Sequence, residues 1–250
     1  MSLDALHAGL GWPAAAALLA VSASTSFITA AFGLGGGAVM LAVLATLLPA
    51  AAIIPVHGVV QLGSNLGRMA MMRPHLDRAA LAPFLGGSLV GAALGGSLLV
   101  ELPAAAIQII VGLFILWSVA ARPPAFLKRS GALAGAVSSF LTMFVGATGP
   151  FVATWLRSRG LDRMGQVATH ATLMTAQHGL KLIVFGALGF AFGQWLPLVA
   201  GLIATGFLGT LLGRQVLLRI DERRFRLALN AVLVVLGARL VWEGARAQLG

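Results

Sequence analysis

The sequence predicts an all-α polytopic membrane protein that consists of two inverted-topology repeats. The chain is 59% hydrophobic and only 10% charged, which is too little charge to cover the surface of a soluble domain of this size. Apolar stretches of about 20 residues, long enough to cross a bilayer, recur along the chain. A glycine-broken apolar segment followed by a helix with spaced polar residues occurs twice, 113 residues apart.

The repeat is defined by matches at this single offset. The first copy begins at Ser26-Phe27-Ile28-Thr29 and the second at Ser139-Phe140-Leu141-Thr142. Further pairs at the same offset are Gly33 with Gly146, Gly36 with Gly149, His57 with His170, Asn65 with His178, and Arg68 with Lys181. We therefore expect residues 1–122 to form the first repeat of one transmembrane domain and residues 123–250 the second.

Hydropathy divides each repeat into a broken segment and three longer helices. In the first repeat we expect an apolar segment at 12–31, a glycine break at 32–37, a short apolar segment at 38–48 and an uncharged linker at 50–55. Three helices follow, at 56–72, 80–99 and 104–120. In the second repeat we expect an apolar segment at 130–145, a break at 146–150, a short apolar segment at 151–156, helices at 164–187, 197–213 and 227–243, and an uncharged loop at 191–197.

The charges of the loops predict the topology. Lys and Arg collect in the loops 68–78, 122–129, 157–163 and 214–226, whereas 49–55 and 191–197 carry no charge. Under the positive-inside rule the first set is cytoplasmic and the second external. Each broken segment then starts and ends on one side as a re-entrant hairpin, and three crossings follow it. An odd number of crossings inverts the second repeat. The alternative is that both arms of each hairpin cross fully, which makes the repeats parallel.

Polar residues recur at helical spacing after each break. His57, Gln61 and Asn65 stand four residues apart and lie on one helical face, and the second copy carries His170, Gln177 and His178. Polar groups at membrane depth normally face a cavity or each other, so we expect these residues to bind substrate. The alternative is that they join neighbouring helices by hydrogen bonds. Arg68 and Lys181 either attract an anion or extend to the lipid headgroups.

The two breaks supply backbone groups for the same site. A break frees backbone N–H groups, and the half-helix that follows begins with its positive dipole end. An anion is the natural ligand of two such ends that face each other. The expected substrate-binding residues here are Gly33, Gly35, Gly36, Gly37, Gly146, Thr148, Gly149 and Pro150. The alternative reading of the glycines is close helix packing.

The composition argues against several other functions. The seven acidic residues fall almost entirely in expected loops or at helix ends, and there is no cysteine. We therefore expect an anion rather than a cation, no metal, no cofactor and no enzyme activity. Histidine remains as the proton carrier if transport is coupled to protons. The net charge of +10 is spread over short loops, which does not favour nucleic-acid binding.

Several motifs together resemble the TauE/SafE sulfite exporter family over essentially the whole chain. They are Phe32-Gly33-x-Gly35-Gly36-Gly37 with Asn65, Val145-Gly146-x-x-Gly149-Pro150 with a Thr-rich helix ending in Lys181, and Phe225-Arg226-Leu227-x-Leu229-Asn230 through Gly237. The resemblance implies transport of sulfite, organosulfonates or related small sulfur oxyanions across the bacterial inner membrane. One departure is His178, where the family more commonly has Asn.

These observations predict a secondary transporter, an exporter by resemblance, that moves a small sulfur-containing anion by alternating access around a midplane site. Its partners are the anion and the lipid bilayer, its location is the cell inner membrane, and a homodimer is an open alternative. A channel-like anion pore and an intramembrane enzyme are the competing functions. A pore conducts, whereas a carrier shows slow and saturable exchange. The lack of buried carboxylates, of cysteine and of an HExxH pattern counts against the enzyme.

Overall fold

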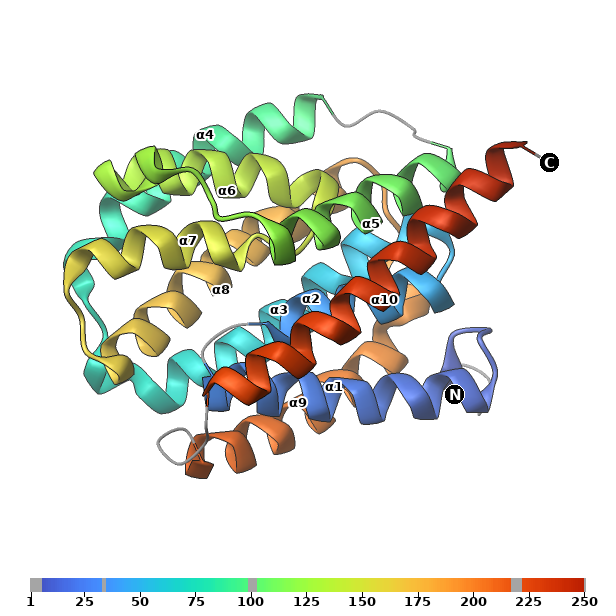
Figure 1. Ribbon diagram of the computed structural model, residues 1–250, viewed down its shortest axis with the longest axis horizontal. Coiled ribbons are helices and arrows are strands. Elements are labelled where there is room, and N and C mark those ends of the chain that lie inside the picture. Colours follow the sequence, from blue (N-terminus) through green and yellow to red (C-terminus); the bar gives the residue numbers. More distant parts are fainter. Residues whose placement is uncertain (1–5, 33–34, 99–102, 217–221, 250) are drawn as a thin grey trace.

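A computed structural model describes residues 6–32, 35–98, 103–216 and 222–249, and this part of the chain is helical without strands. Figure 1 shows the helices as a layered bundle. The first half contains α1 (Trp12–Phe32), α2 (Gly36–Leu47), α3 (Ala50–Met72), α4 (Leu81–Ser97) and α5 (Ala104–Ala120). The second half contains α6 (Gly131–Val145), α7 (Gly149–Leu156), α8 (Arg163–Ala187), α9 (Leu196–Val216) and α10 (Glu222–Leu249).

The helices of the two halves are interleaved. The first helix of each half packs along the fourth helix of the other, α1 against α9 and α6 against α4. The third helices, α3 and α8, pack on each other at the centre, and the fifth helices, α5 and α10, pack on each other at the front of Figure 1. The halves therefore do not form separate bodies.

Glycines allow the exchanged pairs to approach closely. A Cβ added at Gly87 or Gly91 of α4 would collide with the backbone of Ala132 or Ala136 of α6, and one at Gly209 of α9 with the backbone of Ala23. Small residues that let helix backbones approach are typical of membrane helix pairs. Residue numbers rise together along α4 and α6, so these two helices run parallel.

In each of the other two pairs, α3 with α8 and α5 with α10, the two helices run in opposite directions. Gly58 near the start of α3 faces Lys181 near the end of α8. Just beyond the other end of α3, the backbone N–H of Asp77 donates to Thr169 Oγ1 near the start of α8, at 3.0 Å. Likewise, Gly112 of α5 faces Gly237 of α10, whereas Gly244 faces Ala105. The third helices of the two halves are thus antiparallel, and so are the fifth helices.

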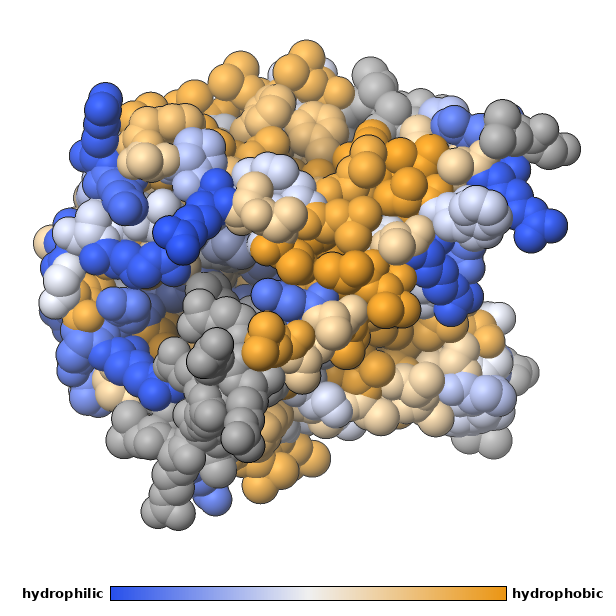
Figure 2. Space-filling view, in the orientation of Figure 1, coloured by the Kyte–Doolittle hydropathy of each residue, from blue (hydrophilic) through white to orange (hydrophobic). Residues whose placement is uncertain are grey.

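The surface fits a lipid environment. By length and hydropathy, four helical segments in the described part of the chain can cross a membrane, at Trp12–Phe32, Arg78–Ser97, Phe192–Gln215 and Leu227–Gln248. Large apolar side chains such as Leu94, Leu212 and Trp242 are exposed on them. Figure 2 shows an apolar band between hydrophilic side chains at the right end and a larger group of them at the left end, where α3 joins α4 and α7 joins α8.

Short 3-10 turns lie between several of the helices. They are η2 (Arg73–His75), η3 (Arg78–Ala80), η4 (Ala125–Arg129), η5 (Arg157–Arg159) and η6 (Phe192–Trp195). Arg159 at the end of η5 forms an ion pair with Asp77, at 2.6 Å. This contact ties the turn after α7 to the turn after α3.

The expected linker 50–55 is wrong, because these residues form the first turns of α3. Only Leu48 and Pro49 separate α2 from α3. Pro49 has φ −55° and ψ 140°, so it turns the chain just before the helix, where a missing N–H costs nothing. Alanine, the strongest helix former, then fills positions 50–52. The uncharged region between α2 and α3 is therefore a sharp corner rather than a loop.

Candidate functional site

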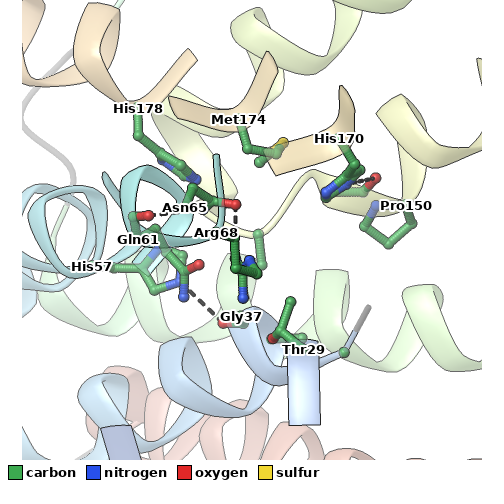
Figure 3. Close-up of a pocket in the computed structure, with 14 residues that line it drawn as sticks. Thr29, Gly37, His57, Gln61, Asn65, Arg68, Pro150, His170, Met174 and His178 are labelled. Atoms are coloured by element: carbon green, nitrogen blue, oxygen red, sulfur yellow. Dashed lines mark hydrogen bonds between the residues drawn. The ribbon is translucent and has the colours of Figure 1, made fainter. Parts of the chain in front are cut away.

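A cavity lined by both polar and apolar residues lies where the two helix breaks meet α3 and α8. Its volume is about 60 Å³, room for a few water molecules or one small ion. Figure 3 shows side chains from both halves pointing toward it. The lining residues are Thr29, Gly35, Gly37, Ala38, His57, Gln61, Asn65, Arg68, Ala147, Gly149, Pro150, His170, Met174 and His178.

The α3 side of the cavity ends in a buried arginine. Arg68 is 3% exposed, and its Nη2 donates to Asn65 Oδ1 at 2.8 Å. The amide of Asn65 is held in turn, since Nδ2 donates to the carbonyl oxygen of Gln61 at 2.7 Å. The other guanidinium nitrogen, Nη1, is buried and has no hydrogen-bond partner in the described structure. Arg68 therefore does not extend to the headgroups, and Asn65 positions it.

Corresponding histidines of the two halves make the same contact. Nε2 of His57 lies 3.0 Å from the carbonyl oxygen of Gly37, at the start of α2. Nε2 of His170 lies 3.1 Å from the carbonyl oxygen of Gly149, at the start of α7. A carbonyl only accepts, so both rings carry their proton on Nε2. Each histidine thus holds the short helix of its own half against the long one.

The third histidine closes one end of the cavity. The ring of His178 meets the ring of His57 edge to face, with centroids 6.1 Å apart. The Nδ1 atoms of both rings are buried without a hydrogen-bond partner in the described structure. The two adjacent rings, with their unpaired nitrogens, form a polar boundary at this end of the cavity.

Glycine is required at the breaks for two different reasons. Gly35 and Gly146 have φ of +103° and +76°, a conformation that other residues rarely adopt. Gly36 has an ordinary conformation, but an added Cβ would collide with the carbonyl oxygen of Thr25 and with Thr29 Oγ1. Gly37 lines the cavity, where an added Cβ would lie 3.4 Å from the Gln61 side chain.

The structure brings together most of the predicted site residues. Those that line the cavity are Gly35, Gly37, His57, Gln61, Asn65, Arg68, Gly149, Pro150, His170 and His178. Those that do not are Gly36, Gly146, Thr148, Gln177 and Lys181. Gly33 lies outside the described residues.

Gln177 belongs to a buried network instead. Its Nε2 donates to Thr148 Oγ1 at 2.7 Å, and its Oε1 accepts from Ser138 Oγ at 3.1 Å. These bonds tie α8 to α6 and to the second break. Gln177 therefore joins neighbouring helices by hydrogen bonds, which was the alternative expected for the recurring polar residues.

Sequence reasoning omitted Thr29, Ala38, Ala147 and Met174 from the site. The match of Thr29 with Thr142 in the repeat was a signal for the first of these.

The cavity carries positive charge and no negative charge among its described lining residues. None of the described lining residues is Asp or Glu, whereas Arg68 contributes a positive charge. The first turns of α2 and α7 also meet the cavity with the positive ends of their dipoles. In the described part of the chain, no group of three or more His, Cys, Asp or Glu residues could hold a metal ion. The arrangement can hold a small anion by hydrogen bonds and charge.

Fold and site together define a polytopic helical membrane protein with a small, positively charged cavity between two broken helices. A family model described as Sulfite exporter TauE/SafE matches residues 18–240. The chain therefore belongs to the TauE/SafE sulfite exporter family, which is a family of transporters. No curated protein and no solved structure matches the chain.

Proposed function

We propose that the protein is a secondary transporter that exports a small sulfur oxyanion, sulfite or an organosulfonate, by alternating access across the cell inner membrane. The observation that carries the proposal is Arg68, whose Nη1 is buried and unpaired in the described structure, beside a cavity whose described lining residues include no carboxylate. A buried charge without a counter-ion is expensive. A bound oxyanion supplies the missing acceptors.

The geometry fits a small oxyanion such as sulfite. The unpaired Nη1 of Arg68 can donate a charge-assisted hydrogen bond to an anion oxygen, as guanidinium groups do to carboxylate and phosphate. The cavity of about 60 Å³ fits an ion of a few atoms. Membership in the TauE/SafE sulfite exporter family also favours a small sulfur oxyanion as the substrate.

The arrangement of helices supports inverted repeats, residues 1–122 and 123–250. Two repeats related by an axis in the membrane plane exchange their partners, and helices that correspond by position pack antiparallel across the axis. Both features are present, in α1 with α9, α4 with α6, α3 with α8 and α5 with α10. If the repeats were parallel, α3 and α8 would run in the same direction, and so would α5 and α10.

Transport by purified protein tests the function. Proteoliposomes loaded with sulfite should release it with saturable kinetics at a rate well below that of a conducting pore, and sulfate or chloride should compete weakly. Ion currents proportional to sulfite concentration without saturation would identify the channel instead. Liposomes without protein are the control, and no sulfite flux above that control would reject the proposal.

The topology has its own test, because the chain is free of cysteine. Ala51 and Gln194 are both exposed and lie on the proposed external side. Single cysteines at these two positions should both react with an impermeant thiol reagent added to intact cells. A cysteine at the exposed Ala79 should react only after permeabilisation. Reaction at one external position but not the other would reject the inverted arrangement.

Replacing Asn65 or His178 should weaken sulfite binding at least about tenfold, because a lost hydrogen bond to a charged group costs about 1.5–3 kcal/mol. Asn65→Ala acts by releasing Arg68, and His178→Ala removes a group that lines the cavity. Isothermal titration measures both. Thr172→Ala, on α8 but outside the lining set, is the matched control. Unchanged affinity in both variants would leave these residues as contacts between helices.

His178→Asn should retain binding but lose the part of its pH dependence that comes from a histidine at this position. Protonation of His178 adds positive charge, so wild-type affinity should fall as the pH rises and the ring loses its proton. Titration of sulfite itself is common to both proteins and cancels in their difference. An identical pH profile for the two proteins would show that His178 is not the titrating group.

A further inference from the structure

Lys181 is a second buried cation, and it does not line the cavity. Its side chain is 0% exposed, and its stem lies against Gly58 of α3. In the described structure its Nζ has one acceptor within hydrogen-bond distance, the carbonyl oxygen of Gly146 at 3.4 Å. A single long bond satisfies an ammonium group with three donors poorly.

Lys181 lies immediately beyond the end of the cavity. It is three residues from His178 on α8, and its contact Gly58 adjoins His57 on α3. The edge-to-face pair of His57 and His178 therefore stands between the cavity and Lys181. Arg68 lies toward the end of α3 that leads into the basic turns proposed to be cytoplasmic, whereas Lys181 lies toward the end of α8 that leads into the uncharged loop proposed to be external.

The two halves do not contribute equally to the cavity. Arg68 and Thr29 of the first repeat line the cavity, whereas their counterparts Lys181 and Thr142 are fully buried and do not. Thr142 instead donates to the carbonyl oxygen of Gly146 at 2.8 Å, the same atom that Lys181 contacts. Inverted repeats that exchange conformations would open the second set and close the first.

We propose that Lys181 is a second anion subsite, which receives the small oxyanion when the cavity opens to the opposite side of the membrane. The inference rests on the proposed transport function. The anion is held at Arg68 in the state described here and at Lys181 in the exchanged state, and the pair of His57 and His178 separates the two positions. The competing role for Lys181 is a permanent brace of the bend at Gly146.

Sided transport kinetics test the subsite. In proteoliposomes with a single protein orientation, the KM for labelled sulfite is measured from each face. Lys181→Gln should raise the ratio of the external to the internal KM at least about tenfold, the loss expected for a bond to a charged ligand. Arg68→Gln, its counterpart, should move the ratio in the opposite direction. A ratio unchanged by Lys181→Gln would establish the structural brace and overturn the subsite.

A second measurement does not depend on the Lys181 variant or on sulfite. Thr142→Cys in this cysteine-free chain should react with external impermeant thiol reagents, and an anionic reagent should react at least about tenfold faster than a cationic one of the same size, because a nearby ammonium attracts it. Thr29→Cys should react from the cytoplasmic face. No reaction of the Thr142→Cys variant from either face, or no preference of its thiol for the anionic reagent, would overturn the subsite.

The two measurements separate the subsite from the proposed function. Absence of sulfite flux in the wild type, together with a preference of the Thr142→Cys variant for the anionic reagent, would reject sulfite as substrate and retain the subsite. Saturable sulfite flux without that preference would retain the transporter and reject the subsite.

Discussion

Arg68→Gln is expected to reduce sulfite binding about 100-fold. The glutamine side chain keeps most of the volume of arginine but removes the charge and the planar pair of donors. Loss of a bond to a charged ligand costs about 1.5–3 kcal/mol, and a 100-fold loss lies within that range. The effect should be large because Arg68 is the one lining residue among those described that carries a permanent charge. Isothermal titration of the purified variant measures it.

Two further variants separate charge from geometry. Arg68→Lys keeps the charge but not the fork of donors, so it should bind about tenfold less tightly than wild type. Asn65→Asp places a carboxylate where Asn65 Oδ1 now accepts from Arg68 at 2.8 Å. This change should neutralise the arginine and repel the anion, with a loss as large as that of Arg68→Gln. Wild-type affinity in Asn65→Asp would show that the anion binds elsewhere.

Gly37→Val and Gly36→Val are expected to fail for different reasons, although the residues are adjacent. In Gly37→Val the new side chain enters the cavity, where the atoms nearest to the added Cβ belong to the flexible Gln61 side chain, at 3.4 Å. The protein should purify with a melting temperature within about 4 °C of wild type, but sulfite flux should fall below detection. Gly37→Ala, which adds a single methyl group, should retain part of the flux.

In Gly36→Val the new side chain meets the carbonyl oxygen of Thr25 and the hydroxyl of Thr29 on α1. Backbone atoms cannot move aside without displacing α1 from α2, and overpacking of this kind typically costs about 1–3 kcal/mol. We therefore expect a lower yield and a lower melting temperature, with loss of flux as a consequence. A stable, inactive Gly36→Val would instead assign Gly36 to the site.

The position of the central cavity could largely be predicted from the repeat. The one offset that relates His57 to His170 and Arg68 to Lys181 is visible in the sequence, and α3 and α8 do carry these residues at the centre of the bundle. Helical spacing is a local property, so it predicts which side chains share a face without knowledge of the partner helix. The same local rule failed at 50–55, where the absence of charge was read as a linker although alanine and a preceding proline begin a helix there.

The sequence by itself determined that the chain is a membrane protein, where its helices break, and which polar residues recur in both halves. Only the tertiary structure decided which of the predicted residues face the cavity. Of the pair Arg68 and Lys181, Arg68 lines it and Lys181 does not, and Gln177 joins a buried network instead. The reason is physical: hydropathy and spacing are nearly the same for corresponding residues. Exposure to a shared cavity depends instead on how helices distant in sequence pack, and interfaces between packed helices have alternative arrangements of similar energy.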